Sequence, residues 1–258
     1  NNRLEIEQAG ISTIDWNLNR KSKNIISEII TLKILINSIQ SFKPSVIHAV
    51  AMKPVIYSSI ASVFVGFENR VFAFAGLGYI FSSTKKNIKF LREFLVTFFK
   101  VTFRGKNSRL VIQNRDDRNE LLTLKIINKN NVRLIRGSGV DCCYFSYSNI
   151  QEEKSIIILP ARMLWDKGVG EFVKAAKIIK QKISGARFVL VGSPDEHNPE
   201  SIEQSQVQNW VNEGFVEWWG HQKNMVYVYH QASIVCLPSY REGLPKSLLE
   251  AASCGRPI

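Results

Sequence analysis

Two acidic side chains near the end of the chain, Glu242 and Glu250, stand eight residues apart around a Gly-Leu-Pro turn at 243–245. The apolar run 233–237 before them predicts a buried strand, and Pro245 suits the first turn of a following helix. Free N–H groups and the dipole at such a helix start attract anions, while carboxylates accept hydrogen bonds from hydroxyls. The stretch therefore suits a ligand with phosphates and hydroxyls, such as a nucleotide sugar. An ordinary strand–loop–helix unit with solvated glutamates explains the spacing equally well.

Two cations, Arg162 and Lys167, flank another loop, which joins an apolar run at 155–161 to a helical pattern. Loops after parallel strands share one edge of a sheet, so we expect this loop on the same edge as Glu242. Arginine offers a planar fork of donors to phosphate oxygens, and lysine offers a compact charge. Together they could neutralise a diphosphate leaving group without a metal. Because surface cations are common, the pair alone is weak evidence for a diphosphate site. The edge that it is expected to share with Glu242 makes it informative.

Signatures of several other chemistries are absent from the sequence. It has no Asp-x-Asp triplet, no Walker loop, no Gly-x-Gly-x-x-Gly fingerprint and no Gly-x-Ser-x-Gly elbow. His197, His221 and His230 have no metal-ligand spacing, so we interpret them as loop or packing residues. We therefore expect neither a metal nor another cofactor.

The composition indicates one large or two ordinary domains, since the chain has 258 residues, 45% of them hydrophobic. The net charge of +12 lies in residues 1–150, while residues 151–258 are balanced. The first half should meet nucleic acid, an anionic membrane or a phosphorylated substrate. The four cysteines, Cys142, Cys143, Cys236 and Cys254, form neither a zinc motif nor a disulfide frame. No uncharged apolar run reaches the roughly 18 residues of a membrane span.

Strand and helix patterns alternate along both halves. After a weak strand at 11–16, the first half has helical patterns at 25–39 and 54–64 with strands at 46–49 and 70–75. This alternation predicts a parallel α/β sheet, and residues 155–258 repeat it. The polar segment 144–154 lies between the halves, so we predict one domain at 1–148 and another at 149–258.

Two features of the first half could face a partner. His48 and the glycine loop 76–79 each follow a predicted strand, which places them on one rim of the sheet. The segment Lys85–Arg109 has eight Lys or Arg residues against one acid, with seven Phe or Leu residues at helical spacing. Such a helix can lie in an anionic membrane interface, although a core helix with a solvated basic face is the alternative. Nucleic acid is less favoured, because no recognition motif accompanies the charge.

At this point the motifs resemble a known family, the family 4 glycosyltransferases. In the second half the resemblance lies in residues 160–168, in Val189–Gly192, and in 238–251, which contain the spaced pair Glu242 and Glu250. In the first half, 46–49, 76–79 and 137–141 look like the CapM-like branch that builds bacterial surface glycans. Nearly the whole chain is covered, although both ends look truncated.

The resemblance implies a GT-B fold, with two Rossmann-like domains facing a cleft, and metal-independent transfer that retains anomeric configuration. The donor would be a nucleotide sugar, usually of UDP, and the acceptor a polyprenyl-diphosphate-linked glycan. The enzyme would be cytoplasmic and peripheral on the inner membrane face. Catalytic positions would be Arg162, Lys167 and Glu242; donor-binding positions Glu250, Gly243, Leu244, Pro245, Gly192 and Gly220; and acceptor-side positions Gly76, Gly78 and His48.

The first half departs from its relatives at Ala75, where many carry a histidine before the glycine loop. A base or sugar contact there is therefore in question, and His48 follows a different predicted strand. Two other activities fit the residues: a GT-B nucleotide-sugar epimerase or hydrolase, and a non-catalytic nucleotide- or lipid-binding module. Turnover without an acceptor would indicate the former, and binding without turnover the latter.

Overall fold

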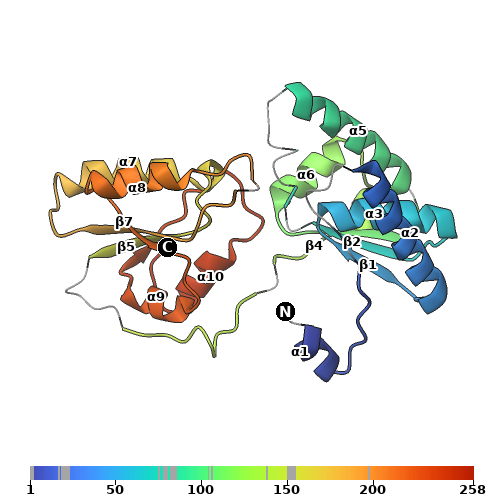
Figure 1. The fold of residues 1–258 in the computed structure, drawn as a ribbon, viewed down its shortest axis with the longest axis horizontal. Helices are drawn as coiled ribbons and strands as arrows, with labels where there is room; N and C mark the ends of the chain where they lie inside the picture. The colour runs from blue at the N-terminus through green and yellow to red at the C-terminus, as the bar shows by residue number, and fades with distance from the viewer. Residues whose placement is uncertain are drawn as a thin grey trace. The chain divides into compact units, whose positions relative to one another are not determined.

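The computed structural model describes residues 3–16, 18, 24–74, 76–77, 81, 86–103, 105, 107–137, 139–149, 155–196 and 198–258. The chain divides into two compact units, Asn1–Ile135 and Arg136–Ile258. Each unit contains a four-stranded parallel sheet with helices packed on it (Figure 1). The predicted α/β class with two parallel sheets is confirmed.

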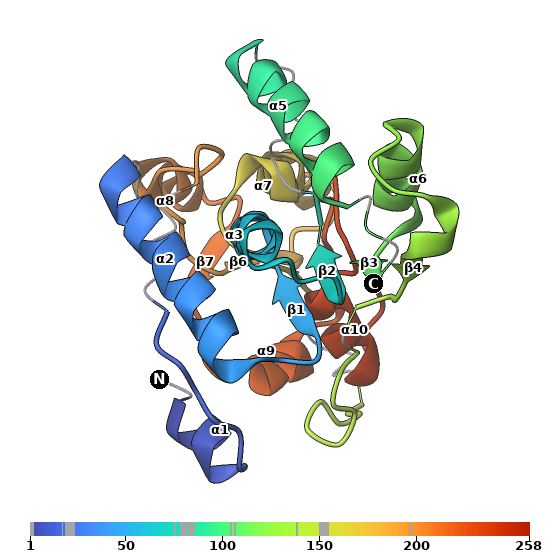
Figure 2. The ribbon, with the colours of Figure 1, turned by 90° about the vertical axis from the view of Figure 1, so that its right-hand side faces the viewer.

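Unit 1 has the strand order β1-β2-β3-β4. Its strands are β1 (Ile47–Val50), β2 (Arg70–Phe74), β3 (Ser108–Ile112) and β4 (Val132–Leu134). Its helices are α1 (Arg3–Gln8), α2 (Ile25–Phe42), α3 (Met52–Val65), α5 (Lys86–Thr102), α6 (Arg115–Thr123) and the short η1 (Lys129–Asn131). Helix α3 contacts β1 and β2, and α2 lies alongside α3 (Figure 2).

Aromatic side chains of β2, of α5 and of Phe103, which follows α5 directly, fill the core of unit 1. Phe72 and Phe103 stack with ring centroids 5.0 Å apart, and Phe99 stacks on Phe103 at 4.8 Å. These three side chains are at most 2% exposed. The period of the apolar residues in α5 brings one stripe of them onto the sheet, as helical spacing predicts.

The N-terminal segment differs from the expectation of a strand at 11–16. Residues 3–8 form α1, and residues 11–16 are irregular because they pair with no strand. The segment is held instead by Trp16, whose Nε1 donates to the carbonyl of Thr31 at 3.0 Å and whose ring meets Tyr57 edge-on at 5.8 Å. A local side-chain contact can replace strand pairing in this way, which an alternating pattern does not reveal.

Helix α2 is long and apolar enough to cross a membrane, judged by length and composition alone. It contains two charged residues, Glu28 and Lys33, which is why it contains no long uncharged run. Glu28 accepts hydrogen bonds from Tyr57 and from Lys53, the latter at 3.0 Å, so it links α2 to α3.

Unit 2 has the strand order β7-β6-β5-β8. Its strands are β5 (Ile156–Pro160), β6 (Arg187–Val191), β7 (Glu217–Gly220) and β8 (Ile234–Val235). Its helices are η2 (Trp165–Lys167), α7 (Val169–Lys180), α8 (Gln204–Asn212), α9 (Met225–Gln231) and α10 (Lys246–Ser253). Figure 1 shows α7 and α8 on one face of this sheet and α9 and α10 on the other. Both faces of β5 are therefore covered, which explains its continuous apolar run.

The segment between the sheets packs with unit 2, so the units divide at residue 135 rather than at the predicted 148. Ser253 Oγ donates to the carbonyl of Phe145 at 2.7 Å, and Ser148 N donates to that of Cys254 at 3.3 Å. Gly137 lies so close to Leu244 that a Cβ at 137 would come within 2.8 Å of Leu244 Cδ2. A polar, irregular sequence does not by itself disclose such anchoring.

All four cysteines are free thiols, as the sequence indicates. Cys142 and Cys143 are exposed in the segment between β4 and β5. Cys254 is buried and Cys236 is partly buried, and burial raises the pKa of both thiols.

Candidate functional site

The carboxyl ends of β5, β6 and β8 meet at one edge of the unit 2 sheet. Pro160 at the end of β5 is in register with Val191 at the end of β6, and Ile158 pairs with Val235 of β8. The loops that follow these strands therefore leave the sheet on the same side. These loops hold Arg162, Lys167 and Glu242, which agrees with the placement that the strand pattern predicts.

Lys167 and Glu242 form an ion pair across two of these loops. The distance from Lys167 Nζ to Glu242 Oε1 is 2.6 Å, and the side chains are 18% and 26% exposed. The loop after β8 is fastened to η2, because Tyr240 N and Ser239 Oγ both donate to the carbonyl of Asp166 at 3.0 Å. Backbone contacts thus bring the two charged side chains together.

Two glycines allow this close approach of the loops. Gly168 has φ 73°, and a Cβ there would lie 2.1 Å from the carbonyl oxygen of Pro238. Gly192 has φ 140°, and a Cβ there would lie 2.0 Å from the carbonyl oxygen of Ala161. Any side chain at these positions would push the loops apart. Both glycines also have φ values that other residues rarely adopt.

Arg162 meets a carboxylate that the sequence analysis did not single out. Its Nη1 lies 2.5 Å from Asp195 Oδ2 in the loop after β6. Arg162 is 58% exposed in its side chain and Asp195 26%, so this pair lies closer to solvent than the pair of Lys167 and Glu242. Both candidate diphosphate ligands are therefore engaged by carboxylates in this structure.

Glu250 lies on α10, and its side chain contacts that of Tyr229 on α9. Tyr229 Oη donates to Glu250 Oε2 at 2.9 Å, while Lys246 Nζ lies 3.7 Å from Glu250 Oε1. Burial, reinforced by the neighbouring carboxylate, raises the pKa of Tyr229 well above its ordinary value. Tyr229 therefore remains a neutral hydrogen-bond donor at physiological pH.

A cleft of about 490 Å³ joins several of these residues. Arg162, Gly192 and Glu250 line it, as do Asp195 and Tyr229. His221 and Gln222 also line this cleft. His221 lies in the loop after β7, as the sequence predicted, and its place beside the cleft is an additional finding. The lining combines a cation, two carboxylates and neutral donors, which suits a polar, phosphorylated ligand.

The other donor-side positions lie around this cleft. Gly220, with φ 65°, accepts a hydrogen bond from Gly192 N at 2.8 Å and lines an adjoining cleft of about 640 Å³. Gly243, Leu244 and Pro245 form the turn into α10, with Pro245 as the residue before the first helical turn. Ser247 in that first turn lines the 490 Å³ cleft, so the start of α10 faces it.

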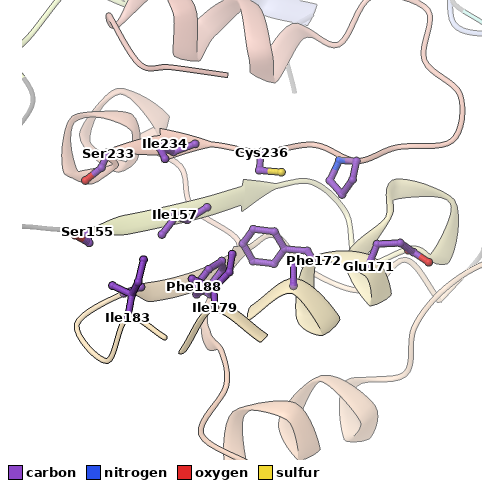
Figure 3. Close-up of a pocket in the computed structure, with 13 residues that line it drawn as sticks. Ser155, Ile157, Glu171, Phe172, Ile179, Ile183, Phe188, Ser233, Ile234 and Cys236 are labelled. Atoms are coloured by element: carbon purple, nitrogen blue, oxygen red, sulfur yellow. The ribbon is translucent and has the colours of Figure 1, made fainter. Parts of the chain in front are cut away.

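A larger cavity of about 650 Å³ lies between α7 and strands β5, β6 and β8. Figure 3 shows apolar side chains gathered around it, among them Ile157, Phe172 and Phe188, with the Glu171 carboxylate pointing away. Its described lining contains no cation. This apolar cavity cannot stabilise phosphate charge, so the smaller polar cleft is the better candidate site despite its size.

Of the candidate residues of unit 1, Gly76 lies at the carboxyl rim of the sheet, as predicted, and His48 does not. His48 is the second residue of β1, opposite Val71, and the strand continues to Val50, so His48 does not stand at the carboxyl rim. Gly76 follows β2 and does lie at that rim, next to Leu77, whose N–H donates to Asp117 Oδ2 at 3.0 Å. Gly78 and Ala75 lie outside the described residues.

Among the described residues, no group of three His, Cys, Asp or Glu side chains could hold a metal ion. Metal independence stays a prediction, because it concerns the reaction rather than this arrangement.

Asp195 and Tyr229, which the sequence analysis missed, become visible only in three dimensions. Each reaches its partner from a different element, and neither belongs to a local motif.

Comparison with known proteins gives two family matches. A model described as "Glycosyl transferase 4-like" matches residues 1–114, and one described as "Glycosyl transferases group 1" matches residues 154–258. Together they account for most of the chain, one match in each unit.

Curated relatives are bacterial glycosyltransferases. The chain is 26% identical to N,N'-diacetylbacillosaminyl-diphospho-undecaprenol alpha-1,3-N-acetylgalactosaminyltransferase of Campylobacter jejuni, over 98% of this chain and 68% of the relative. It is 24% identical to the capsular polysaccharide biosynthesis glycosyltransferase CapM of Staphylococcus aureus, over 43% of this chain and 29% of CapM.

Among solved structures, Anabaena HepE in complex with UDP matches with a TM-score of 0.71 and 15% identity, over 99% of this chain and 68% of HepE. This likeness shows the GT-B fold. Since each unit is matched by a glycosyltransferase family model, the chain belongs to the glycosyltransferases.

Proposed function

We propose that the polar cleft of unit 2 binds the nucleoside diphosphate part of a sugar donor, with UDP as the nucleotide. The observation that carries this proposal is the convergence in one cleft of Arg162, Glu250 and the start of α10. A guanidinium and free helix N–H groups suit phosphates, and a carboxylate suits ribose hydroxyls. The volume of about 490 Å³ also lies within the usual range of small-molecule sites.

In the proposed reaction, the bond between the anomeric carbon of the sugar and the β-phosphate oxygen breaks. The acceptor hydroxyl oxygen forms the new bond to that carbon, its proton passes to the departing β-phosphate oxygen, and UDP leaves. Lys167 and Arg162 stabilise the charge that develops on the diphosphate, and Glu242 contacts the sugar. The transfer retains anomeric configuration and requires no metal, since side-chain cations replace it.

For the acceptor, we propose a glycan on a polyprenyl diphosphate. The name of the Campylobacter jejuni relative describes an enzyme that acts on an undecaprenol-diphosphate-linked sugar. The excess positive charge within residues 1–150 suits such an anionic, lipid-linked molecule. On the acceptor side, Gly76, Gly78 and His48 remain proposals.

Helix α5 supports a peripheral position on the inner face of the membrane. Its inner stripe, including Phe99, is buried, whereas Phe90, Phe94 and Val101 are 77%, 63% and 64% exposed. A core helix with a merely basic outer face would not present these side chains to solvent. Exposed aromatics beside Lys89 and Lys100 suit an anionic lipid surface.

The assay that tests this function combines the full chain with a set of nucleotide sugars and a polyprenyl-diphosphate-linked glycan. Release of UDP together with a lengthened, lipid-linked product is the expected result, and product anomers resolved by NMR test retention. Turnover of the donor without acceptor would instead indicate an epimerase or hydrolase. Binding without any turnover would indicate a non-catalytic module.

A further inference from the structure

Tyr229 is the one tyrosine among the described residues that line the polar cleft, and its hydroxyl meets a carboxylate there. We infer that Tyr229 is a positioning residue, which orients Glu250 so that the carboxylate can recognise the ribose hydroxyls of the donor. This inference rests on the proposed function, because it deepens the role of Glu250 in nucleotide binding.

The surroundings of Tyr229 leave its side chain little freedom. Tyr229 is fully buried, and its ring centroid lies 6.1 Å from that of Phe145 in the segment before β5. The N-terminus of its helix is capped, because Asn224 Oδ1 accepts a hydrogen bond from Tyr227 N at 3.1 Å. A hydroxyl held in this way presents its proton in one direction, so it can act as a rigid reference for a neighbouring group.

The carboxylate of Glu250 has two unequal oxygens. Oε2 accepts a hydrogen bond from Tyr229 Oη at 2.9 Å, whereas Lys246 Nζ lies 3.7 Å from Oε1 and its side chain is 65% exposed. A pair one helical turn apart is weak when its lysine is mostly exposed and the charges are 3.7 Å apart, so it leaves Oε1 available to a ligand. Since Glu250 lines the cleft and is 13% exposed, a ribose hydroxyl can reach that oxygen.

Without the hydrogen bond from Tyr229, the Glu250 carboxylate would lose its fixed orientation. Lys246 would then compete for both oxygens, and the ribose would meet a carboxylate that must first be ordered. Hydrogen bonds to a charged group contribute more than neutral ones, so losing this one should weaken nucleotide binding by about tenfold.

The test compares Tyr229→Phe with wild type by calorimetric titration of the full chain with UDP and with 2′,3′-dideoxyuridine diphosphate. Tyr229→Phe keeps the buried ring and removes only the hydroxyl. Tyr227→Phe is the matched control, because Tyr227 lies on the same helix and is 62% exposed. Glu250→Ala completes the set, because it removes the carboxylate itself.

We expect Tyr229→Phe to raise the dissociation constant of UDP about tenfold and to leave that of the dideoxy compound unchanged. Tyr227→Phe should bind both as wild type does. Equal weakening of both nucleotides by Tyr229→Phe would overturn the inference, because it would indicate general loss of structure. Unchanged UDP binding by Tyr229→Phe, with Glu250→Ala weakened, would also overturn it while sparing the proposed function. Unchanged UDP binding by Glu250→Ala would reject the ribose assignment itself.

Discussion

Lys167 Nζ and Glu242 Oε1 lie 2.6 Å apart, although 75 residues separate them in the sequence. Both side chains are mostly shielded from solvent, so each charge has its counter-charge within the site. A diphosphate that approaches Lys167 must share or replace this carboxylate. The pair is thus a contact between two candidate catalytic residues, one from the loop after β5 and one from the loop after β8.

Replacing Lys167 tests the role of this cation. We expect Lys167→Ala to lower kcat by at least about tenfold, because one charge that stabilises the leaving diphosphate is lost. Steady-state UDP release measures the effect, with Lys174→Ala on the exposed face of α7 as control. In a double-mutant cycle with Glu242→Ala, the two losses should not add. Additive effects would show that the residues act independently.

Asp195 should oppose donor binding through its contact with Arg162. In Asp195→Asn the guanidinium keeps its charge and loses its carboxylate partner, so we expect UDP to bind several-fold more tightly. Calorimetry measures this change, and Glu213→Gln removes the same charge at a residue that does not line the cleft. Weaker binding in Asp195→Asn would mean that Asp195 instead orients Arg162 for the phosphates.

The exposed stripe of α5 should determine attachment to lipid. We expect Phe90→Ser combined with Phe94→Ser to reduce binding to phosphatidylglycerol vesicles by about tenfold or more, since two large apolar side chains no longer leave water. Sedimentation with vesicles measures it, and Ile178→Ser on α7 is the control, with an exposed apolar residue of unit 2.

Varying the salt concentration separates the electrostatic from the apolar contribution to vesicle binding. Wild-type attachment should weaken as ionic strength rises, because lipid charge is screened from Lys89 and Lys100. Binding that ignores salt would contradict the role of the basic residues. Binding that survives both serine substitutions would contradict the role of the apolar stripe.

Arg187 and Glu217 connect β6 to β7 by two hydrogen bonds of 2.7 Å. The hydrogen bonds from Arg187 hold the pKa of Glu217 below its ordinary value of 4.5. A lowered folded pKa means that the pair stabilises the fold above the ordinary value, and that this contribution is lost as pH falls through the folded one. Both side chains are over a third exposed, so the contribution is about 1 kcal/mol or less.

Glu217→Gln should therefore lower the free energy of unfolding at pH 7 by up to about 1 kcal/mol. Its difference from wild type should shrink below pH 4.5, which urea denaturation at a series of pH values measures. Glu213→Gln removes a single contact to Lys177 and should change less. A difference that grows in acid would contradict this account.

Much of the fold follows from local patterns. Strand β6 consists of Arg187 and four apolar residues and ends just before Gly192; a continuous apolar run of this kind is typical of a strand covered on both faces. The edge shared by Arg162, Lys167 and Glu242 follows from the general geometry of parallel sheets. The failures lie where tertiary contacts decide: residues 11–16 have no strand partner, and His48 lies inside β1 rather than at its end.

The site shows the same division. The motif residues Glu242 and Glu250 could be predicted, since their spacing is carried by one loop and one helix. Asp195 and Tyr229 could not, because each acquires its role from a partner on another element. Similarly, the packing of Phe145 against Tyr229 assigns the segment before β5 to unit 2, although its polar sequence predicts a linker.

The cysteines offer a practical route to observing the two units in solution. Adjacent Cys142 and Cys143 are exposed, whereas burial raises the pKa of the Cys236 and Cys254 thiols and slows their alkylation. Maleimide dyes should therefore attach to the native protein between β4 and β5. With one of the two exposed cysteines changed to serine, a single fluorophore would report on that segment whenever nucleotide or lipid binds.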